Sequence, residues 1–125
     1  MKTRVLTGTT SAGGDLTVND TLSILGELYA IEFVQGTLDN AATDVTVSVQ
    51  STESGVALTL LTLTNVTASG MYHVRHLAHG EAGAALTGTA GGDRVKPLIN
   101  GTLRMVVAQG GNAKTGGVVV YYEND

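Results

Sequence analysis

Several residue types are scarce or absent in this chain of 125 residues. There is no cysteine, which excludes disulfides and thiolate metal sites. There is no tryptophan and only 4% of the residues are aromatic, so the chain lacks the stacking side chains with which proteins hold single-stranded nucleic acids or sugars. Helical periodicity is nearly absent as well, which leaves β-strands as the expected regular structure.

Charged residues are also few, at 14% of the chain, and the net charge is −4. The seven basic residues are scattered along the sequence, which argues against binding to the phosphates of DNA or RNA. No apolar run approaches the roughly 18 residues of a membrane span, and the N-terminus lacks the apolar core of a signal peptide. We therefore expect neither a nucleic-acid partner nor a membrane partner.

Alternation of apolar and polar residues is the dominant pattern. Residues 44–51 alternate valines with polar side chains, which is typical of a strand with one buried face. Residues 22–36 are long enough for a helix, but their aromatic and branched side chains alternate and favour a strand. In residues 56–64 the alternation changes phase at Leu60-Leu61, so either a β-bulge lies there or both faces of that strand are buried.

Turn signals divide the C-terminal third of the chain. Ile99–Tyr122 predicts two consecutive β-hairpins, the first turning at Asn100-Gly101 and the second at Gly110–Gly117. Pro97 is the only proline, and because it has no backbone donor we expect its strand to lie at a sheet edge.

Eight or nine short strands separated by turns are typical of a sandwich or barrel. We predict an all-β, single-domain antiparallel β-sandwich, jelly-roll-like with about eight strands, in preference to an immunoglobulin-like sandwich. Residues 1–14 are an N-terminal arm or the first edge strand, and residues 15–125 are the sandwich domain. His76–Asp93 is rich in glycine and alanine and predicts a long loop.

The three histidines form a weak candidate for a metal site: His73, His76 and His79 recur every third residue. Imidazole is a common ligand of transition metals. Residues three apart on a strand point to opposite faces, however, and no fourth ligand is evident. The favoured interpretation is that these are surface or interface histidines, and we expect no cofactor.

Catalytic motifs are not found in the sequence. The glycine-rich run around Lys114 superficially resembles a phosphate-binding loop, but Ala113 precedes the lysine and a strand pattern follows it. No nucleophile elbow or paired carboxylates stand out. We expect no catalytic residues and no enzymatic activity.

Two runs carry a resemblance to a known family: Leu61–Tyr72, which reads LTLTNVTASGMY, and Leu103–Gly116, which reads LRMVVAQGGNAKTG. They resemble segments of small auxiliary head proteins of tailed bacteriophages, the capsid decoration or cement proteins. The resemblance covers roughly Leu58 to Tyr122, about half of the chain, and AQGGNAK is its most distinctive part.

The resemblance implies a β-sandwich that forms a homotrimer on the outside of an icosahedral capsid and stabilises the junctions between capsomers. The implied partner is the major capsid protein, and the implied location is the virion surface, after synthesis in the bacterial cytoplasm. The residues that we expect to contact the capsid or a neighbouring subunit are Lys2, Arg4, Leu6, Leu61, Leu63, His76, His79, Arg94, Asn112 and Lys114.

Two alternative functions stay open. One is a head–tail joining, tail or head-fibre component, for which rings of six or twelve subunits would be expected. The other is a glycan- or receptor-binding β-sandwich, against which the scarcity of aromatic residues counts.

Overall fold

The computed structural model describes residues 1–39, 41–77 and 94–124, and its regular structure is entirely β. Within these ranges it contains no helix long and apolar enough to cross a membrane. The all-β prediction is confirmed. The strands are β1 (Lys2–Thr9), β2 (Leu16–Val34), β3 (Thr43–Gln50), β4 (Ala57–Val66), β5 (Gly70–Tyr72), β6 (His76–Leu77), β7 (Arg94–Val95), β8 (Leu98–Ala108) and β9 (Thr115–Glu123).

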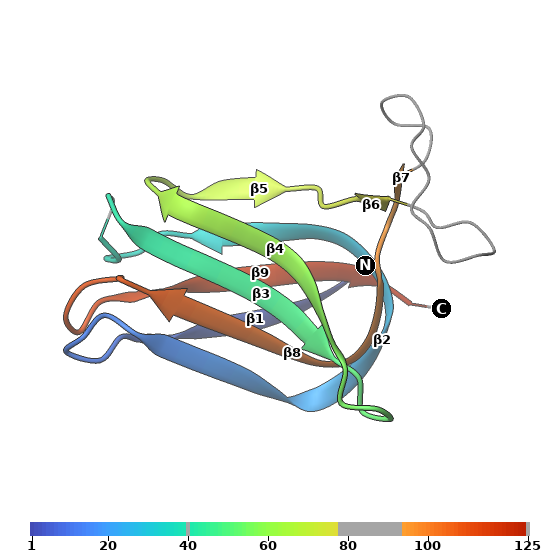
Figure 1. Ribbon diagram of the computed structural model, residues 1–125. Helices are drawn as coiled ribbons and strands as arrows, with labels where there is room; N and C mark the ends of the chain where they lie inside the picture. The colour runs from blue at the N-terminus through green and yellow to red at the C-terminus, as the bar shows by residue number, and fades with distance from the viewer. Residues whose placement is uncertain (40, 78–93, 125) are drawn as a thin grey trace.

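Seven of the strands form one antiparallel sheet in the order β1-β9-β2-β8-β3-β4, with β5 paired to β2. The long strand β2 is shared, because its first part pairs with β8 and its second part pairs with β9 and β5. The sheet therefore folds at β2 into two layers that face each other (Figure 1). We call them the β8 layer (first part of β2, β8, β3, β4) and the β9 layer (β1, β9, second part of β2, β5).

The two parts of β2 and the six other strands make eight segments, four in each layer. Numbered along the chain, the β9 layer has the order 1-8-3-6 and the β8 layer the order 2-7-4-5. These are the strand orders of the jelly roll, which is built from two Greek keys. The predicted jelly-roll-like sandwich of about eight strands is confirmed.

Gly26 allows the bend in β2. At this point Glu27 pairs with both Leu98 of β8 and Glu123 of β9. A Cβ on Gly26 would lie 2.5 Å from the carbonyl oxygen of Glu123, which is far inside van der Waals contact. Only glycine therefore lets the bend pack this closely against the end of β9.

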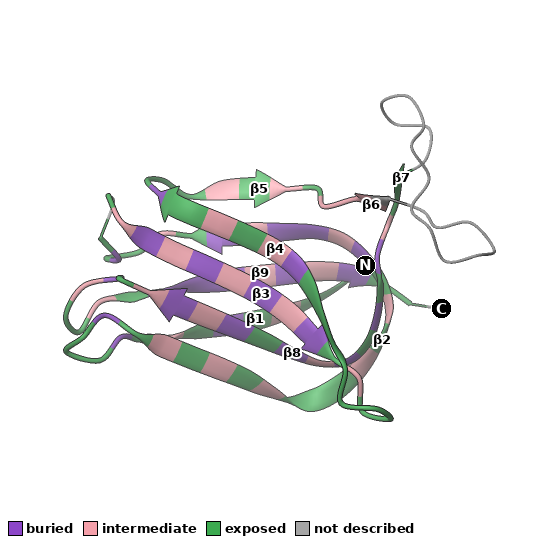
Figure 2. Ribbon diagram, viewed as in Figure 1, coloured by how far each residue is buried: buried purple, intermediate pink, exposed green. Residues whose placement is uncertain are grey.

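The core lies between the two layers and takes side chains from both. Figure 2 shows the resulting alternation of buried and less buried residues along β3, β8 and β9. Val45, Val47 and Val49 are buried, which confirms the alternation expected of residues 44–51. The largest fully buried side chains are Phe33, Leu28, Ile31, Ile99, Leu103 and Met105.

The change of phase in β4 is a β-bulge. Val47 pairs with Leu61 and Ser48 with Thr59, so Leu60 is an extra residue opposite β3. Both Leu60 and Leu61 pack on the core as a result. Of the two interpretations that the sequence left open, the bulge is the one that the structure contains.

The prediction of a hairpin turn at Asn100-Gly101 is wrong. Both residues lie inside the continuous strand β8. Gly101 has φ +146°, and a Cβ on it would lie 1.9 Å from the carbonyl oxygen of Gln50. Glycine is needed here because β8 approaches β3 closely, and an Asn-Gly pair that serves this purpose has the same sequence as a tight turn.

The second predicted hairpin is wrong in its pairing. A turn does join β8 to β9, but the two strands belong to different layers and do not pair with each other. Pro97 lies in the connection between β7 and β8, outside both strands. The strand that follows, β8, lies between β2 and β3 rather than at an edge. This is possible because Pro97 precedes the strand, so its missing N–H removes no hydrogen bond from the β8 ladders.

Candidate interaction surfaces

The outward face of the β8 layer is polar. One row across it, set by the strand register, consists of Thr17, Val106, Thr46 and Thr62. Threonine is a strand former that also hydrogen-bonds to water. The polar groups of this face can therefore hydrogen-bond to water without a protein partner.

The outward face of the β9 layer is different, because exposed apolar side chains come together on it. Val5, Val119, Glu32 and Met71 form one row across β1, β9, β2 and β5. Val5 is 62% exposed and Met71 48%, while Val34 in the neighbouring row is 41% exposed. We call the surface formed by Val5, Val34, Met71 and Val119 the apolar face.

A hollow of about 280 Å³ lies on this face, lined by Val5, Val34, Val119 and the glycines at the start of β9. Glu32 is the charged side chain in the middle of the face, and its carboxylate accepts a hydrogen bond of 2.9 Å from the Tyr121 hydroxyl. That bond raises the pKa of the Tyr121 phenol above its usual value. A partner that covers this face therefore meets apolar side chains around one carboxylate, that of Glu32, which already accepts a hydrogen bond within the subunit.

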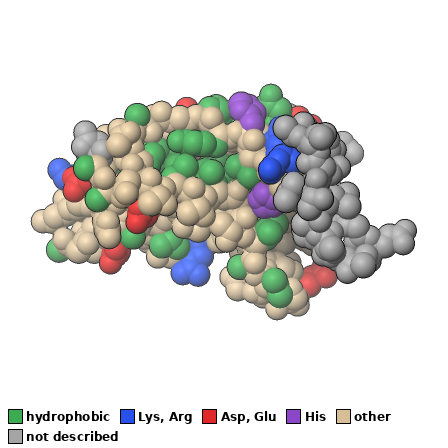
Figure 3. All heavy atoms as spheres, turned by 45° about the horizontal axis from the view of Figure 1, so that its top comes forward, with side chains coloured by type: hydrophobic (Ala, Val, Ile, Leu, Met, Phe, Trp, Pro, Cys, Tyr) green, Lys and Arg blue, Asp and Glu red, His purple; other side chains and the backbone are tan. Residues whose placement is uncertain are grey.

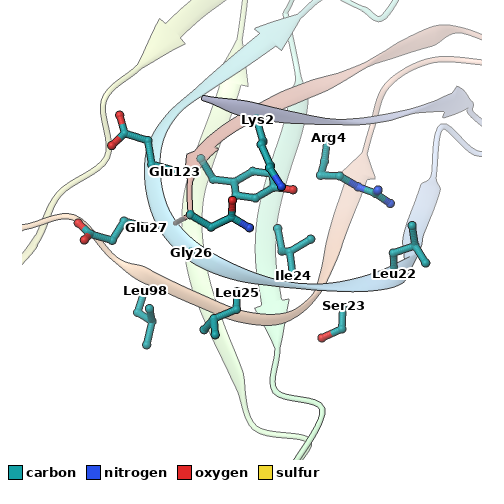
Figure 4. Close-up of a pocket in the computed structure, with 12 residues that line it drawn as sticks. Lys2, Arg4, Leu22, Ser23, Ile24, Leu25, Gly26, Glu27, Leu98 and Glu123 are labelled. Carbon is teal, nitrogen blue, oxygen red and sulfur yellow. The ribbon is translucent and has the colours of Figure 1, made fainter.

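A second group of exposed apolar side chains lies at the bend of β2. Leu25 and Leu98, which are 60% and 58% exposed, lie on one side of β2, and we call them the corner patch; Leu22, also 58% exposed, lies on the opposite side, that of Lys2 and Arg4 (Figure 4). All three leucines line a groove of about 690 Å³, to which β1 contributes Lys2 and Arg4. In this view Leu25 and Leu98 point away from the cationic side chains, toward the other side of the β2 ribbon.

Arg4 does not present a free charge in this groove. Its guanidinium donates from Nε to Asp20 Oδ2 at 2.7 Å and from Nη2 to Asp20 Oδ1. Burial raises the pKa of the Asp20 carboxyl, but hydrogen bonds from Arg4 and from the Leu22 N–H outweigh it, and the pKa lies below its usual value. The pair joins β1 to β2 and closes this side of the sandwich.

The candidate metal ligands are not brought together where the structure describes them. His73 packs edge-on against Tyr29, with the ring centroids 5.6 Å apart. His76 lies in β6, opposite Val95, and His79 lies outside the described residues. No three His, Cys, Asp or Glu side chains cluster in residues 1–39, 41–77 and 94–124.

The leucines expected to make contacts have different surroundings. Leu6 is a core residue, 2% exposed, so its side chain is not available to a partner while the sandwich is closed. Residues Lys2–Thr9 form an edge strand along their whole length. Leu61 and Leu63 are partly buried at the margin of the core, on the edge strand β4.

The remaining contact candidates lie at opposite ends of the sandwich. Arg94 is exposed in β7, next to the segment 78–93 that lies outside the described residues. Asn112 is exposed and Lys114 half-buried in the turn between β8 and β9. This turn is fixed to the β1–β2 connection, since the Thr10 N–H donates to the Lys114 carbonyl at 2.8 Å.

Sequence reasoning missed the residues of both apolar surfaces. Val34, Leu25, Leu98 and Met71 alternate like other strand residues, and alternation alone does not say which face is covered. One signal was available: the run of three valines in β9 has no polar position and indicates a strand that is apolar on both faces.

No protein-family model, curated protein or solved structure matches this chain.

Proposed function

We propose that this protein is a structural protein of a bacteriophage virion, which binds as a trimer to the outside of the capsid and stabilises the junctions between capsomers. The fold supports this role because a jelly roll presents two broad sheet faces that suit contact between proteins. The sequence resemblance to decoration proteins supports the choice of a capsid as the partner.

The observation that carries the proposal is the presence of two separate apolar surfaces on a charge-poor chain. Exposed apolar side chains that gather in patches mark sites of protein–protein contact, whereas isolated ones do not. The apolar face lies on the β9 layer, and the corner patch lies at the bend of β2.

Two different patches suit a ring better than a simple dimer. A two-fold dimer needs one self-complementary surface, whereas a closed ring pairs one surface of each subunit with a different surface of the next. In the proposed trimer the apolar face of one subunit contacts the corner patch of its neighbour. The edge strand β4 then remains free for the capsid.

Two measurements test this function. Light scattering of the purified protein should give a mass of about 38 kDa, three times the 12.8 kDa of one chain. The protein should also sediment with phage heads that lack it, prepared from the phage that encodes it. A stable monomer, or no binding to these heads, would contradict the proposal. Rings of six or twelve would favour the head–tail joining or tail alternative.

A further inference from the structure

The four sheet edges of the sandwich are protected to different degrees. Natural proteins protect edge strands by making them short, by charged side chains or by covering them. In the β9 layer, β5 is only three residues long. At the other side, β1 and the first part of β2 are joined across the layers by the ion pair of Arg4 and Asp20. These three edges are therefore poor sites for another strand.

The fourth edge, β4, has none of these protections. It is ten residues long, and Ala57–Val66 contains no charged residue and no proline. In the described part of the chain β4 pairs only with β3, so its other side has no strand neighbour. A long, uncharged edge of this kind is a template for a further strand.

The space beside β4 is apolar. Figure 3, which brings the top of Figure 1 forward, shows hydrophobic side chains gathered in the middle of this side of the molecule. Leu58, near the start of β4, is 43% exposed, and Leu61 and Leu63 farther along the strand are only partly buried. The short strand β5 leaves these leucines incompletely covered, and a strand added to β4 would cover them.

The strand register shows which backbone groups of β4 face this open side. The Ser51 N–H donates to the Val56 carbonyl at 2.9 Å, which makes them a hydrogen-bonded pair at the start of the β3–β4 ladder. Hydrogen-bonded and non-bonded pairs alternate in an antiparallel ladder. Thr59 and Thr62, opposite Ser48 and Thr46, fall at non-bonded positions, so their N–H and carbonyl groups point away from β3.

We propose that the outer edge of β4 binds an extended segment of the capsid protein, which adds to the β8 layer as a fifth, antiparallel or parallel, strand. This inference rests on the proposed function and names the site of its capsid contact. Main-chain hydrogen bonds provide the affinity in such strand addition, and pockets for alternate side chains provide the specificity. The segment that fits is uncharged and carries apolar side chains at alternate positions, toward the leucines of β4.

A flexible segment of the partner fits this edge better than a second copy of the chain does. The bulge at Leu60 interrupts the regular spacing of backbone groups along β4. In a two-fold pair of β4 strands both partners would be rigid and both would carry the bulge, and their ladders would mismatch. An extended segment can instead adjust its own backbone to the bulge.

The test compares two substitutions at Thr62 in sedimentation with phage heads that lack this protein. Thr62→Pro removes a donor from the free edge and leaves the ladder to β3 intact, whereas Thr62→Val changes the side chain and keeps the donor. We expect the proline variant to bind the heads about tenfold more weakly, the loss of roughly one backbone hydrogen bond. The valine variant should bind like the wild type, and both should keep the melting transition of a folded protein.

Hydrogen exchange of the wild type provides a readout that needs no variant. Amides of residues 57–66 that face the open edge should exchange more slowly in the head-bound protein than in the free protein. Equal binding of both variants with unchanged exchange at β4 would overturn the strand addition and leave the proposed function intact. Failure of the wild type to bind heads would overturn both. Protection of β4 in the free protein, with loss of self-association in Thr62→Pro, would show that a second copy is the occupant.

Discussion

Replacing the three most exposed side chains of the apolar face by serine should separate assembly from folding. The triple variant Val5→Ser, Val34→Ser, Met71→Ser removes apolar surface that points away from the core. The inward neighbours of these residues, such as Leu6 and Phe33, keep their packing. We expect a folded protein with a reduced tendency to form trimers.

The size of the effect follows from the exposure of each side chain. Complete burial of a valine or methionine side chain contributes about 2 kcal/mol. The free subunit leaves 62% of Val5, 41% of Val34 and 48% of Met71 exposed, and a contact that covers all three would gain about 3 kcal/mol from them. The general costs of association are the same in both proteins, so this difference weakens the contact by roughly a hundredfold.

Light scattering over a dilution series measures this change. The midpoint of trimer dissociation should move to higher concentration by about two orders of magnitude or more, because three contacts close the ring. The control is Thr17→Ser, Thr46→Ser, Thr62→Ser on the polar face of the β8 layer, which should leave the midpoint unchanged. If the apolar-face variant dissociates like the wild type while remaining folded, the face is not a contact surface between subunits.

Two further predictions concern the fold that carries these surfaces. Asp20→Asn should destabilise the protein by about 1–3 kcal/mol at neutral pH, because it breaks the charge-assisted hydrogen bonds to Arg4. Since the native pKa of Asp20 lies below its usual value, this stability is present above about pH 4 and is lost as the pH falls through the native pKa. The melting temperatures of the wild type and of Asp20→Asn should therefore converge in acid. A constant difference between them down to about pH 2 would contradict the role of the pair. Gly101→Ala should lower the free energy of unfolding in urea by more than about 2 kcal/mol, through the positive φ and the contact with the Gln50 carbonyl; an unchanged urea midpoint would show that β8 can move away.

The sequence allowed the strands and the class of fold to be predicted because their signals are local. The alternation of valines in residues 44–51 reports one buried face directly, and the phase change at Leu60-Leu61 marked the irregular position, where the structure then showed a bulge. The strand count was close because glycine-rich turns separate most of the strands. Each of these inferences uses only neighbours along the chain.

The pairing of the strands could not be obtained in this way. In a jelly roll most connections cross between layers, so consecutive strands are usually not partners. The hairpin expected between β8 and β9 failed for this reason. The turn expected at Asn100-Gly101 failed because a glycine required for close approach to Gln50 has the same sequence signature as one required for a turn.

The candidate contact residues show the same limit of local patterns. Leu6 was expected on a surface because its segment could be an arm, and pairing of that segment with β9 makes it a core residue instead. Val34 and Met71 come from strands that are adjacent in space but far apart in sequence, and only the register places them on one face. Apolar residues therefore become contact candidates only once the two faces of each strand are known.

The surfaces that the fold protects from other chains, and those that it leaves open, connect the fold to the proposed assembly. Three of the four sheet edges are short or tied by the Arg4–Asp20 pair, while the apolar face, the corner patch and the β4 edge are left open. An isolated protein with three open adhesive surfaces would aggregate, because unpaired backbone and apolar side chains favour any partner. A ring uses two of these surfaces between its own subunits, and the third then faces outward from each subunit in the same orientation. Three copies of one weak edge contact would reach the capsid together, and their combined affinity would exceed that of a single subunit without any further contact.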